Sequence, residues 1–177
     1  MQLKPLDSPA LLQLAASWLA EKENYQWLDF GDGHQLVSPA WLKIGLQRGT
    51  YAIRIFTSDD DRTPIGVVGL SNVNQHFKTA NLFVVLGDKA HGGRGYASLA
   101  TSRMLSIGFR ELRLRAIQTW IADGNPSVHV ARNVGFRPVG RQRQCHSIDG
   151  RVYDRLLFDV LASEHEEIQD VRRQQIA

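Results

Sequence analysis

The strongest structural signal in this chain is the stretch NLFVVLGDKAHGGRGYASLA, from Asn81 to Ala100. It opens on an apolar run, Leu82 to Leu86, and passes through a polar turn and a glycine cluster into residues of good helical propensity. This order predicts a strand that leads directly into a helix. The first backbone N–H groups of a helix have no partner within it, and the helix dipole favours negative charge there. The stretch therefore predicts either a phosphate-binding cradle or an ordinary strand-to-helix reversal built on glycine.

Regular elements are expected on both sides of this stretch. Ser8-Pro9 and Ser38-Pro39 each combine a capping side chain with a proline suited to a first helical turn. Asp149-Gly150 is a favoured pair for a hairpin turn. Strands are expected over residues 3–6, 50–57, 64–73, 82–86 and 115–121, with helices after Ser8 and Ser38, over 96–112 and from Asn125-Pro126-Ser127, and a hairpin at the end.

These elements predict an α+β fold with a mixed sheet. The strands around Val84 and Thr119 would form the central parallel pair, joined through a helix by a right-handed crossover. A chain of 177 residues, 43% of them hydrophobic, suits one domain with a substantial core. We expect that domain to span residues 1–163. The charged tail, residues 164–177, is expected to be peripheral or frayed.

Composition excludes several classes of protein. No apolar segment approaches the ~20 residues that span a bilayer, and the start MQLKPLDSPALL does not resemble a signal peptide. One cysteine, Cys145, excludes an internal disulfide and a multi-cysteine metal site, and we expect it to be buried on a late strand. The net charge of +3 is too mild to indicate nucleic acid. We therefore expect a cytoplasmic protein with no metal and no membrane or nucleic-acid partner.

The order of motifs carries a family resemblance. The apolar strand, LGDK, GRGYA, LRLRAIQTWIADGNPS and RNVGFRPVG follow one another as they do in the GNAT superfamily of N-acetyltransferases. The chain resembles most closely the branch that acetylates ribosomal-protein N-termini and small amines. The resemblance covers roughly residues 64–161 and includes the Gly135-Phe136 signature. It implies a twisted mixed sheet of about seven strands, flanked by helices and splayed at its central parallel pair.

The resemblance also implies acetyl-CoA as co-substrate. The family's pyrophosphate loop maps to Gly92, Gly95 and Ala97, and the Arg94 side chain could meet the same anion. The strand before it would contact the pantetheine arm through its backbone groups. The side chains of the same strand could at the same time pack in the core. The full set expected to bind the cofactor is Val84, Val85, Leu86, Gly92, Gly93, Arg94, Gly95, Tyr96, Ala97 and Asn125.

The residues for proton transfer depart from the family pattern. The central-strand position that often carries a carboxylate is Asn81, and an asparagine cannot usefully accept a proton at neutral pH. The position of the family's frequent tyrosine is Ala131. The serine of the ribosomal-protein branch does match, at Ser127, where it could face the leaving thiolate or merely begin a helix. Candidate bases in loops are His76, Asp29, Asp32 and His34, each of which could equally be a surface residue.

The missing carboxylate favours a particular acceptor. Deprotonating a lysine amine of pKa ~10.4 at pH 7 costs about 4.6 kcal/mol, whereas an α-amine of pKa ~7.8 costs about 1 kcal/mol. We therefore expect acetyl transfer to a low-pKa primary amine, a protein N-terminus or a small amine, with the aromatic loop of residues 25–30 as part of its binding wall. A non-catalytic acyl-CoA-binding module is the main alternative. A dinucleotide-binding domain fits less well, because Ser98 stands at its third glycine. An edge strand in the final hairpin could pair with a second copy.

Overall fold

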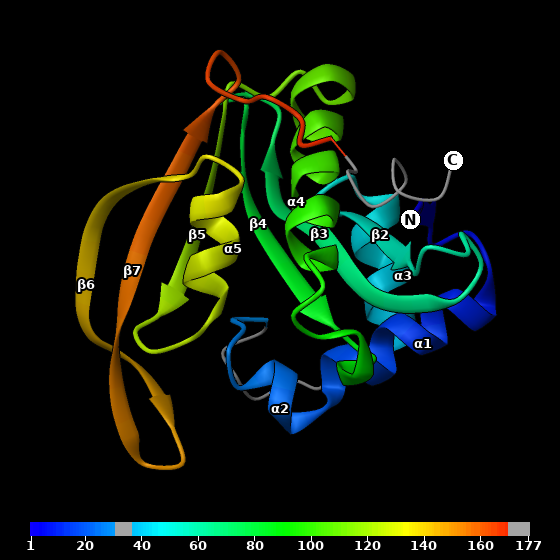
Figure 1. Ribbon diagram of the computed structural model, residues 1–177, viewed down its shortest axis with the longest axis horizontal. Coiled ribbons are helices and arrows are strands. Elements are labelled where there is room, and N and C mark those ends of the chain that lie inside the picture. The colour runs from blue at the N-terminus through cyan, green and yellow to red at the C-terminus, as the bar shows by residue number, and fades with distance from the viewer. Residues whose placement is uncertain (31–36, 170–177) are drawn as a thin grey trace.

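The computed structural model describes residues 1–30 and 37–169 (Figure 1). Its strands are β1 (Leu3–Pro5), β2 (Ala52–Thr57), β3 (Pro64–Asn74), β4 (Thr79–Leu86), β5 (Ala116–Ala122), β6 (Arg137–Ile148) and β7 (Arg151–Leu161). Its helices are α1 (Pro9–Ala20), α2 (Lys22–Tyr25), α3 (Pro39–Gln47), α4 (Tyr96–Ser106) and α5 (Ser127–Asn133), with a 3-10 turn η1 (Lys89–His91) and a π-helical turn η2 (Ile107–Glu111). None of the helices in this described part of the chain is long and apolar enough to cross a bilayer.

The seven strands form one mixed sheet in the order β1-β2-β3-β4-β5-β7-β6. Only β4 and β5 run parallel, and the helix α4 lies on the crossover between them. Their pairing covers three residue pairs, from Thr79↔Ala116 to Asn81↔Gln118. Beyond Asn81 the two strands separate, and Figure 1 shows the resulting opening between β4 and β5. The predicted mixed sheet with a splayed parallel pair is therefore confirmed.

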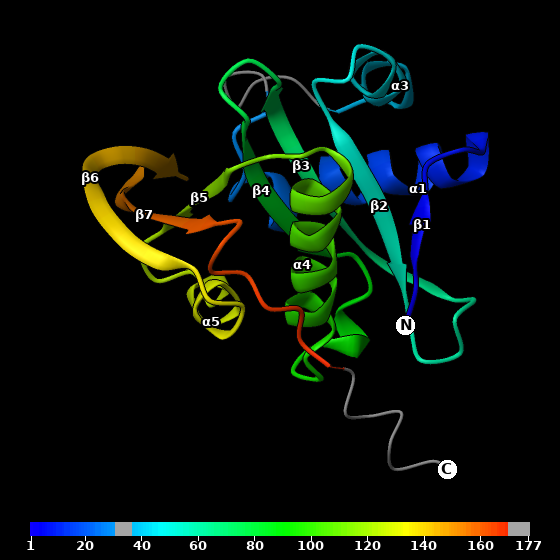
Figure 2. The ribbon, with the colours of Figure 1, turned by 90° about the horizontal axis from the view of Figure 1, so that it is seen from above.

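Two apolar cores lie on opposite faces of this sheet. One core packs α4 and α5 against the sheet through residues such as Leu99 and Ala131. The other packs α1 and α3 through residues such as Leu19 and Leu42. Figure 2 shows α4 and α5 on one side of the strands and α1 on the other. Because both faces are covered, β4 alternates between the cores, with Leu82 facing the first and Phe83 the second.

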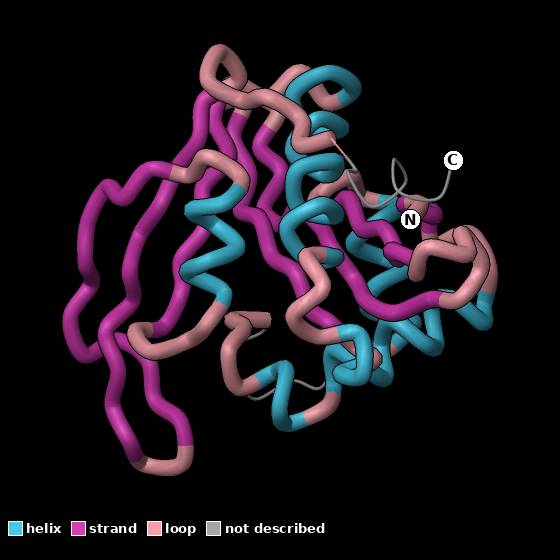
Figure 3. Tube along the Cα trace, viewed as in Figure 1, coloured by secondary structure: helices cyan, strands magenta, loops and turns pink. Residues whose placement is uncertain are grey.

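The capping signals act as expected. The Ser8 hydroxyl accepts a hydrogen bond from the Leu11 N–H at 3.3 Å, and α1 begins at the following proline. Ser38 does the same for α3, accepting from the Trp41 N–H at 3.2 Å. In the last hairpin both turn residues, Asp149 and Gly150, have positive φ, as this two-residue turn requires. Its strand β6 is an edge of the sheet (Figure 3), so pairing with a second copy stays a prediction.

The helix expected over residues 96–112 is shorter than predicted. The α-helix α4 ends at Ser106 and widens into η2, in which the Leu112 N–H bonds to the Ile107 carbonyl at 3.2 Å. Packing accounts for this change. A Cβ added at Gly108 would lie 2.7 Å from the Ile117 side chain, so the chain passes very close to β5 at this point. Cys145 also differs from expectation, since it is only half-buried.

The segment after β7 does not fray at once. The His165 Nε2 lies 2.9 Å from the Ser106 hydroxyl, and the Ile168 N–H donates to the Ser102 hydroxyl at 2.9 Å. These contacts hold the segment up to Ile168 against α4, and Figure 1 shows the segment crossing that helix. Residues 170–177 of the expected tail lie outside the described residues.

Candidate active site

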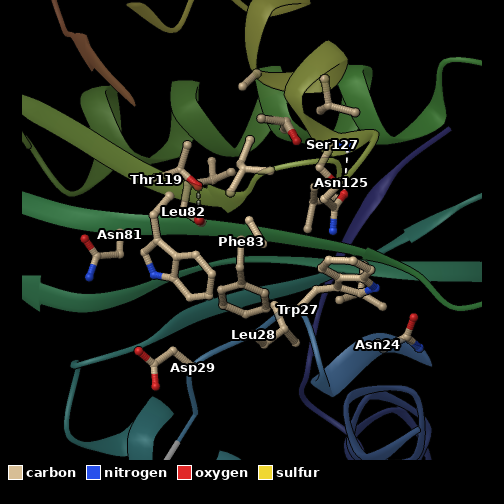
Figure 4. A pocket seen from close by; sticks show the side chains of 18 of the residues that line it. Asn24, Trp27, Leu28, Asp29, Asn81, Leu82, Phe83, Thr119, Asn125 and Ser127 are labelled. Carbon is tan, nitrogen blue, oxygen red and sulfur yellow. Dashed lines mark hydrogen bonds between the residues drawn. The ribbon is translucent and has the colours of Figure 1, made fainter. Parts of the chain in front are cut away.

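A cavity of about 420 Å³ lies where β4 and β5 separate (Figure 4). Its lining comes mainly from β4, β5, the start of α5 and α2 with the loop after it, with further residues from β3, η1 and α4. Among the predicted site residues it brings together Asn81, Val84, Val85, Leu86, Asn125 and Ser127. In Figure 4, Asn81 and Asp29 lie toward one end of the cavity, and Asn125 and Ser127 lie toward the other.

The backbone of β4 presents hydrogen-bonding groups to this cavity at alternate residues. The Leu82 carbonyl accepts from the Thr119 hydroxyl of β5 at 3.0 Å, so the backbone of Leu82 faces the opening. Successive residues of a strand direct their backbone groups to opposite edges. Val84 and Leu86 therefore also face the opening, where β5 no longer pairs with them. Val85, the third predicted residue, directs its backbone groups toward β3. It is nevertheless among the residues that line the cavity.

The glycine loop sets the backbone conformation at the start of α4, where an anion is expected to bind. Gly95 is the N-cap residue with φ +78°, and no side chain caps the helix. Gly93 has φ +72°, and a Cβ at either glycine would meet nothing within 4 Å. Both glycines are thus needed for backbone conformation, and the space beside them is open. Uncapped N–H groups at a helix start, next to open space, are suited to bind a phosphate.

The other residues of this loop contribute in different ways. Tyr96 is buried, and its hydroxyl donates to the Asp59 carboxylate at 2.7 Å, so its side chain is turned away from the open side of the loop. Only the backbone of Tyr96 can serve the predicted anion site. The side chain of Arg94 is exposed beside the loop, whereas Gly92 and Ala97 flank the two left-handed glycines.

Asn125 and Ser127 are placed by a turn at the start of α5. The Asn125 Oδ1 accepts a hydrogen bond from the Ser127 N–H at 2.8 Å, drawn as a dashed line in Figure 4. The side-chain amide of Asn125 is therefore oriented, and its Nδ2 remains a donor. Because Asn125 makes the bond that closes this turn, the Ser127 hydroxyl is not the helix cap. Ser127 is half-buried in the lining of the cavity.

Of the candidate bases from loops, the structure describes Asp29 and His76, and only one of these two lines the cavity. Asp29 lines the cavity. His76 does not: it is exposed on the turn between β3 and β4, where its ring lies 4.8 Å from that of Phe77. The structure therefore does not bring His76 to the other candidate residues. Asp32 and His34 lie outside the described residues.

Two aromatic side chains of the loop of residues 25–30 line the cavity, and an aromatic side chain of α3 packs behind them. Trp27 and Phe30 line the cavity. Trp41 stands behind them, with its ring centre 5.9 Å from Phe30 and 5.0 Å from Tyr51. Trp41 thus supports the wall but does not line it.

Three further lining residues, Asn24, Lys89 and Trp120, were not predicted from the sequence. The Lys89 Nζ lies 2.5 Å from the Asn24 Oδ1 and 2.7 Å from the Leu86 carbonyl, which ties α2 to the end of β4. Trp120, on β5, lines the cavity beyond the point where the strands part. Asn24 and Lys89 are 65 positions apart, so no local pattern indicates their contact.

Comparisons with known proteins agree with this geometry. A family model described as an acetyltransferase (GNAT) domain matches residues 1–137. The chain is 29% identical over 125 residues to the uncharacterized N-acetyltransferase p20 of Bacillus licheniformis, covering 70% of this chain and 68% of that protein. It is 30% identical over 118 residues to the probable N-acetyltransferase YjcK of Bacillus subtilis (strain 168), covering 66% and 65%.

Solved structures show the same fold. The spermidine N-acetyltransferase of Vibrio cholerae in complex with CoA and spermine superposes with a TM-score of 0.79 at 21% identity, over 92% of this chain and 96% of that one. A dodecameric structure of the Vibrio enzyme gives 0.77 at 21% identity, over 92% and 94%. The prediction from the sequence motifs is confirmed: the chain belongs to the GNAT family of acetyltransferases.

Proposed function

We propose that this acetyltransferase moves the acetyl group of acetyl-CoA to a primary amine of low pKa, either a protein N-terminus or a small amine such as an amino sugar. Acetyl-CoA supplies an activated thioester, and the amine nitrogen attacks its carbonyl carbon directly in a ternary complex. The carbon–sulfur bond then breaks, and CoA leaves as the thiolate. The observation that carries the proposal is the cavity at the splayed strands, which has polar groups for the cofactor but no carboxylate on β4.

The residues present can bind successive parts of acetyl-CoA, from its pyrophosphate through the pantetheine arm to the thioester. The uncapped start of α4 and the open space beside Gly93 and Gly95 suit the pyrophosphate. The backbone groups of Val84 and Leu86 that face the opening suit the amides of the pantetheine arm. The Asn125 Nδ2 can donate to a pantetheine carbonyl, since its Oδ1 is already used. A backbone N–H of β4 in the opening can stabilise the developing oxyanion.

The acceptor side supports an amine that loses its proton easily. Asn81 lines the cavity where relatives often carry a carboxylate, and it can donate or accept a hydrogen bond without taking a proton. An α-amine of pKa ~7.8 is partly neutral at pH 7, so water can remove its proton at a cost of about 1 kcal/mol. Trp27, Leu28, Phe30 and Trp120 line the same cavity, and we name these four residues the acceptor wall.

Ser127 is the residue proposed to assist the leaving group. Its hydroxyl lies in the cavity lining and is not the cap of α5, which leaves it available to hydrogen-bond the departing sulfur. Asn81 and Ser127 lie toward opposite ends of the cavity in Figure 4. The Asn81 and Ser127 side chains would therefore approach the reacting thioester from opposite sides of the cavity.

A non-catalytic acyl-CoA-binding module is the second candidate. The observation that favours it is that Asn81 and Ala131 both line the cavity at positions where relatives often carry proton-transfer groups. Such a module would bind acetyl-CoA but release no thiol with any amine.

A matched acceptor panel tests the proposal. Release of CoA thiol is followed with one short peptide whose N-terminus is free or blocked, each with and without lysine, beside several amino sugars. We expect transfer to the free N-terminus or to an amino sugar. Preferred acetylation of the blocked, lysine-containing peptide would contradict the proposed acceptor class. Binding of acetyl-CoA with no transfer across the panel would favour the non-catalytic module.

A further inference from the structure

Arg155, on β7, sits behind the acceptor wall and contacts three residues from different parts of the chain. Its Nη1 lies 2.9 Å from the Asp29 carboxylate. Its guanidinium carbon lies 3.7 Å from the centre of the Trp120 ring, within the range of a cation–π contact. Its Nη2 lies 3.3 Å from the His146 Nδ1. The Arg155 side chain is 17% exposed and that of Asp29 is 44% exposed, so their ion pair joins a largely buried guanidinium to a partly exposed carboxylate.

His146, on β6, contacts the same loop as Arg155 but at its other end, Gln26. It is buried, and its Nε2 lies 2.7 Å from the Gln26 carbonyl oxygen. A carbonyl only accepts, so Nε2 must carry the hydrogen, and Nδ1 then accepts from Arg155. Together, His146 and Arg155 attach both ends of the segment Gln26–Asp29 to the hairpin of β6 and β7.

The ion pair between Arg155 and Asp29 affects the net charge of the cavity. The charged side chains among its described lining residues are Glu23, Asp29 and Lys89. The charge of Asp29 is offset by Arg155, and the other two groups, Glu23 and Lys89, carry one charge of each sign. The cavity thus has nearly no net charge from these groups. A polyamine, which carries several positive charges, would find little to balance them there.

Apolar side chains lie beside Asp29 in the lining of the cavity. In Figure 4, Phe83, Leu28 and Trp27 lie between Asp29 and Asn24. Trp120 completes the surface with one face stacked on Arg155. An acceptor whose amine is flanked by an uncharged apolar group would bury that group against this surface, at a gain of roughly 25 cal/mol per Å².

We infer that Arg155 is a specificity-determining residue that neutralises Asp29 and supports Trp120. It would thereby select amines next to an uncharged apolar side chain over polyamines and over N-termini that begin with a cationic residue. The inference rests on the proposed function, because it concerns the acceptor of the same transfer. Arg155 acts through Asp29 and Trp120 and is thus a positioning residue. This selectivity would differ from that of the Vibrio enzyme, which was solved with spermine.

The test uses three peptides with free N-termini that differ only in their first residue, which is leucine, arginine or glutamate, together with spermidine. For the unaltered protein we expect kcat/KM for the leucine peptide to exceed that for the arginine peptide and for spermidine by at least about tenfold. Arg155→Met leaves Asp29 without its partner, so the preference for leucine over arginine should fall at least about fivefold, mostly through the acceptor KM. Asp29→Asn leaves Arg155 without its carboxylate partner, so the glutamate peptide should gain and the arginine peptide should lose.

Arg141→Met is the matched control. Arg141 is likewise an arginine of the last hairpin that pairs with carboxylates, Asp123 at 3.0 Å and Asp154 at 2.9 Å, but none of these three residues lines the cavity. Its peptide preferences should equal those of the unaltered protein. Binding of the peptides is measured separately by calorimetry with CoA in place of acetyl-CoA, so that no transfer occurs. If Arg155→Met does not fold, the exposed Asp29→Asn change decides the question.

Two failures are distinguishable. Equal use of the leucine and arginine peptides, or unchanged ratios in both variants, overturns the role of Arg155 while the proposed function stands. Transfer to no free N-terminus and no amino sugar overturns the proposed function. In that case the calorimetric preference among the peptides still decides whether Arg155 sets the charge of the cavity.

Discussion

The Thr119 hydroxyl donates a hydrogen bond to the Leu82 carbonyl, with 3.0 Å between the two oxygens. This bond lies one residue beyond the last backbone pair of the parallel strands, Asn81↔Gln118. A side chain replaces a backbone donor at the point where β5 leaves β4. The Leu82 carbonyl is thereby satisfied without a continued ladder, and the strands beyond it are free to enclose the cavity.

The first prediction concerns this bond. Thr119→Val keeps the shape of the side chain but removes its donor, which leaves the Leu82 carbonyl without this partner at the point of separation. We expect a loss of about 1 kcal/mol in the free energy of unfolding and a several-fold weaker affinity for acetyl-CoA. Denaturant unfolding and calorimetry measure the two effects. Thr119→Ser keeps the donor and should restore most of both. A valine variant with unchanged stability and affinity would show that the bond is dispensable.

The second prediction concerns the glycine loop. Gly95→Ala places a Cβ at φ +78°, in space that is otherwise open. The strain should cost about 1 kcal/mol, and the methyl group would stand where the phosphate approaches, so affinity for CoA should fall at least about tenfold. Gly49→Ala is the matched control, because Gly49 has φ +68° and equally open surroundings after α3. It should show similar strain with unchanged CoA affinity. Equal CoA affinity in the two variants would refute the assignment of the loop.

A third prediction concerns Asn81 and proton removal. With no carboxylate on β4, kcat/KM should rise with pH through the acceptor amine's own pKa, near ~7.8 for an N-terminus. Asn81→Ala should lower the rate by less than about tenfold, because the residue orients groups without exchanging a proton. Rates from pH 6 to 9.5 with a free N-terminal peptide supply the measurement. A loss of several orders of magnitude in this variant, with CoA affinity intact, would assign Asn81 a direct catalytic role.

The sequence predicted those features that a few adjacent residues determine. Ser8-Pro9, Ser38-Pro39 and Asp149-Gly150 each act within one turn, and the structure places all three as expected. The glycine loop is also a local feature, whereas the splayed parallel pair was expected from the crossover rule and from the resemblance to the GNAT family. The end of α4 was not predicted, because the widening at Gly108 depends on how closely β5 approaches it.

The cavity was predictable only in part, because its details depend on contacts between distant residues. Arg155 lies 126 positions from Asp29, and nothing near either residue indicates their ion pair. The position of His76 also depends on the fold. The sequence left two roles open for it, a base or a surface residue. The Asn74 Oδ1 accepts from the His76 N–H at 3.0 Å and closes a turn that leaves the imidazole exposed.

A fourth prediction follows from His165, whose pKa is lowered, chiefly by burial against α4. A histidine whose folded pKa is depressed is protonated more readily in the unfolded chain. Its contribution to stability is therefore present above the unfolded pKa of about 6.5 and is lost as the pH falls through the folded value. The melting temperature should fall between pH 7.5 and 5, and His165→Gln should reduce that fall. His76→Gln, a change on the exposed turn, is the control and should behave as the unaltered protein. An identical acid slope in the His165 variant would contradict this account.

The last prediction separates a chemical from a structural role for Ser127. Its hydroxyl lines the cavity, while the turn before α5 is closed by Asn125. Ser127→Ala should therefore leave the melting temperature and the acetyl-CoA affinity nearly unchanged while lowering kcat at least about tenfold, because the leaving thiolate loses a hydrogen-bond donor. Ser8→Ala provides the contrast: Ser8 caps α1, so its loss should cost about 1 kcal/mol of stability with kcat preserved. Thiol release at saturating substrates, calorimetry and thermal unfolding measure the three quantities. If Ser127→Ala instead loses stability and keeps its turnover, the hydroxyl supports the helix and some other group must meet the sulfur.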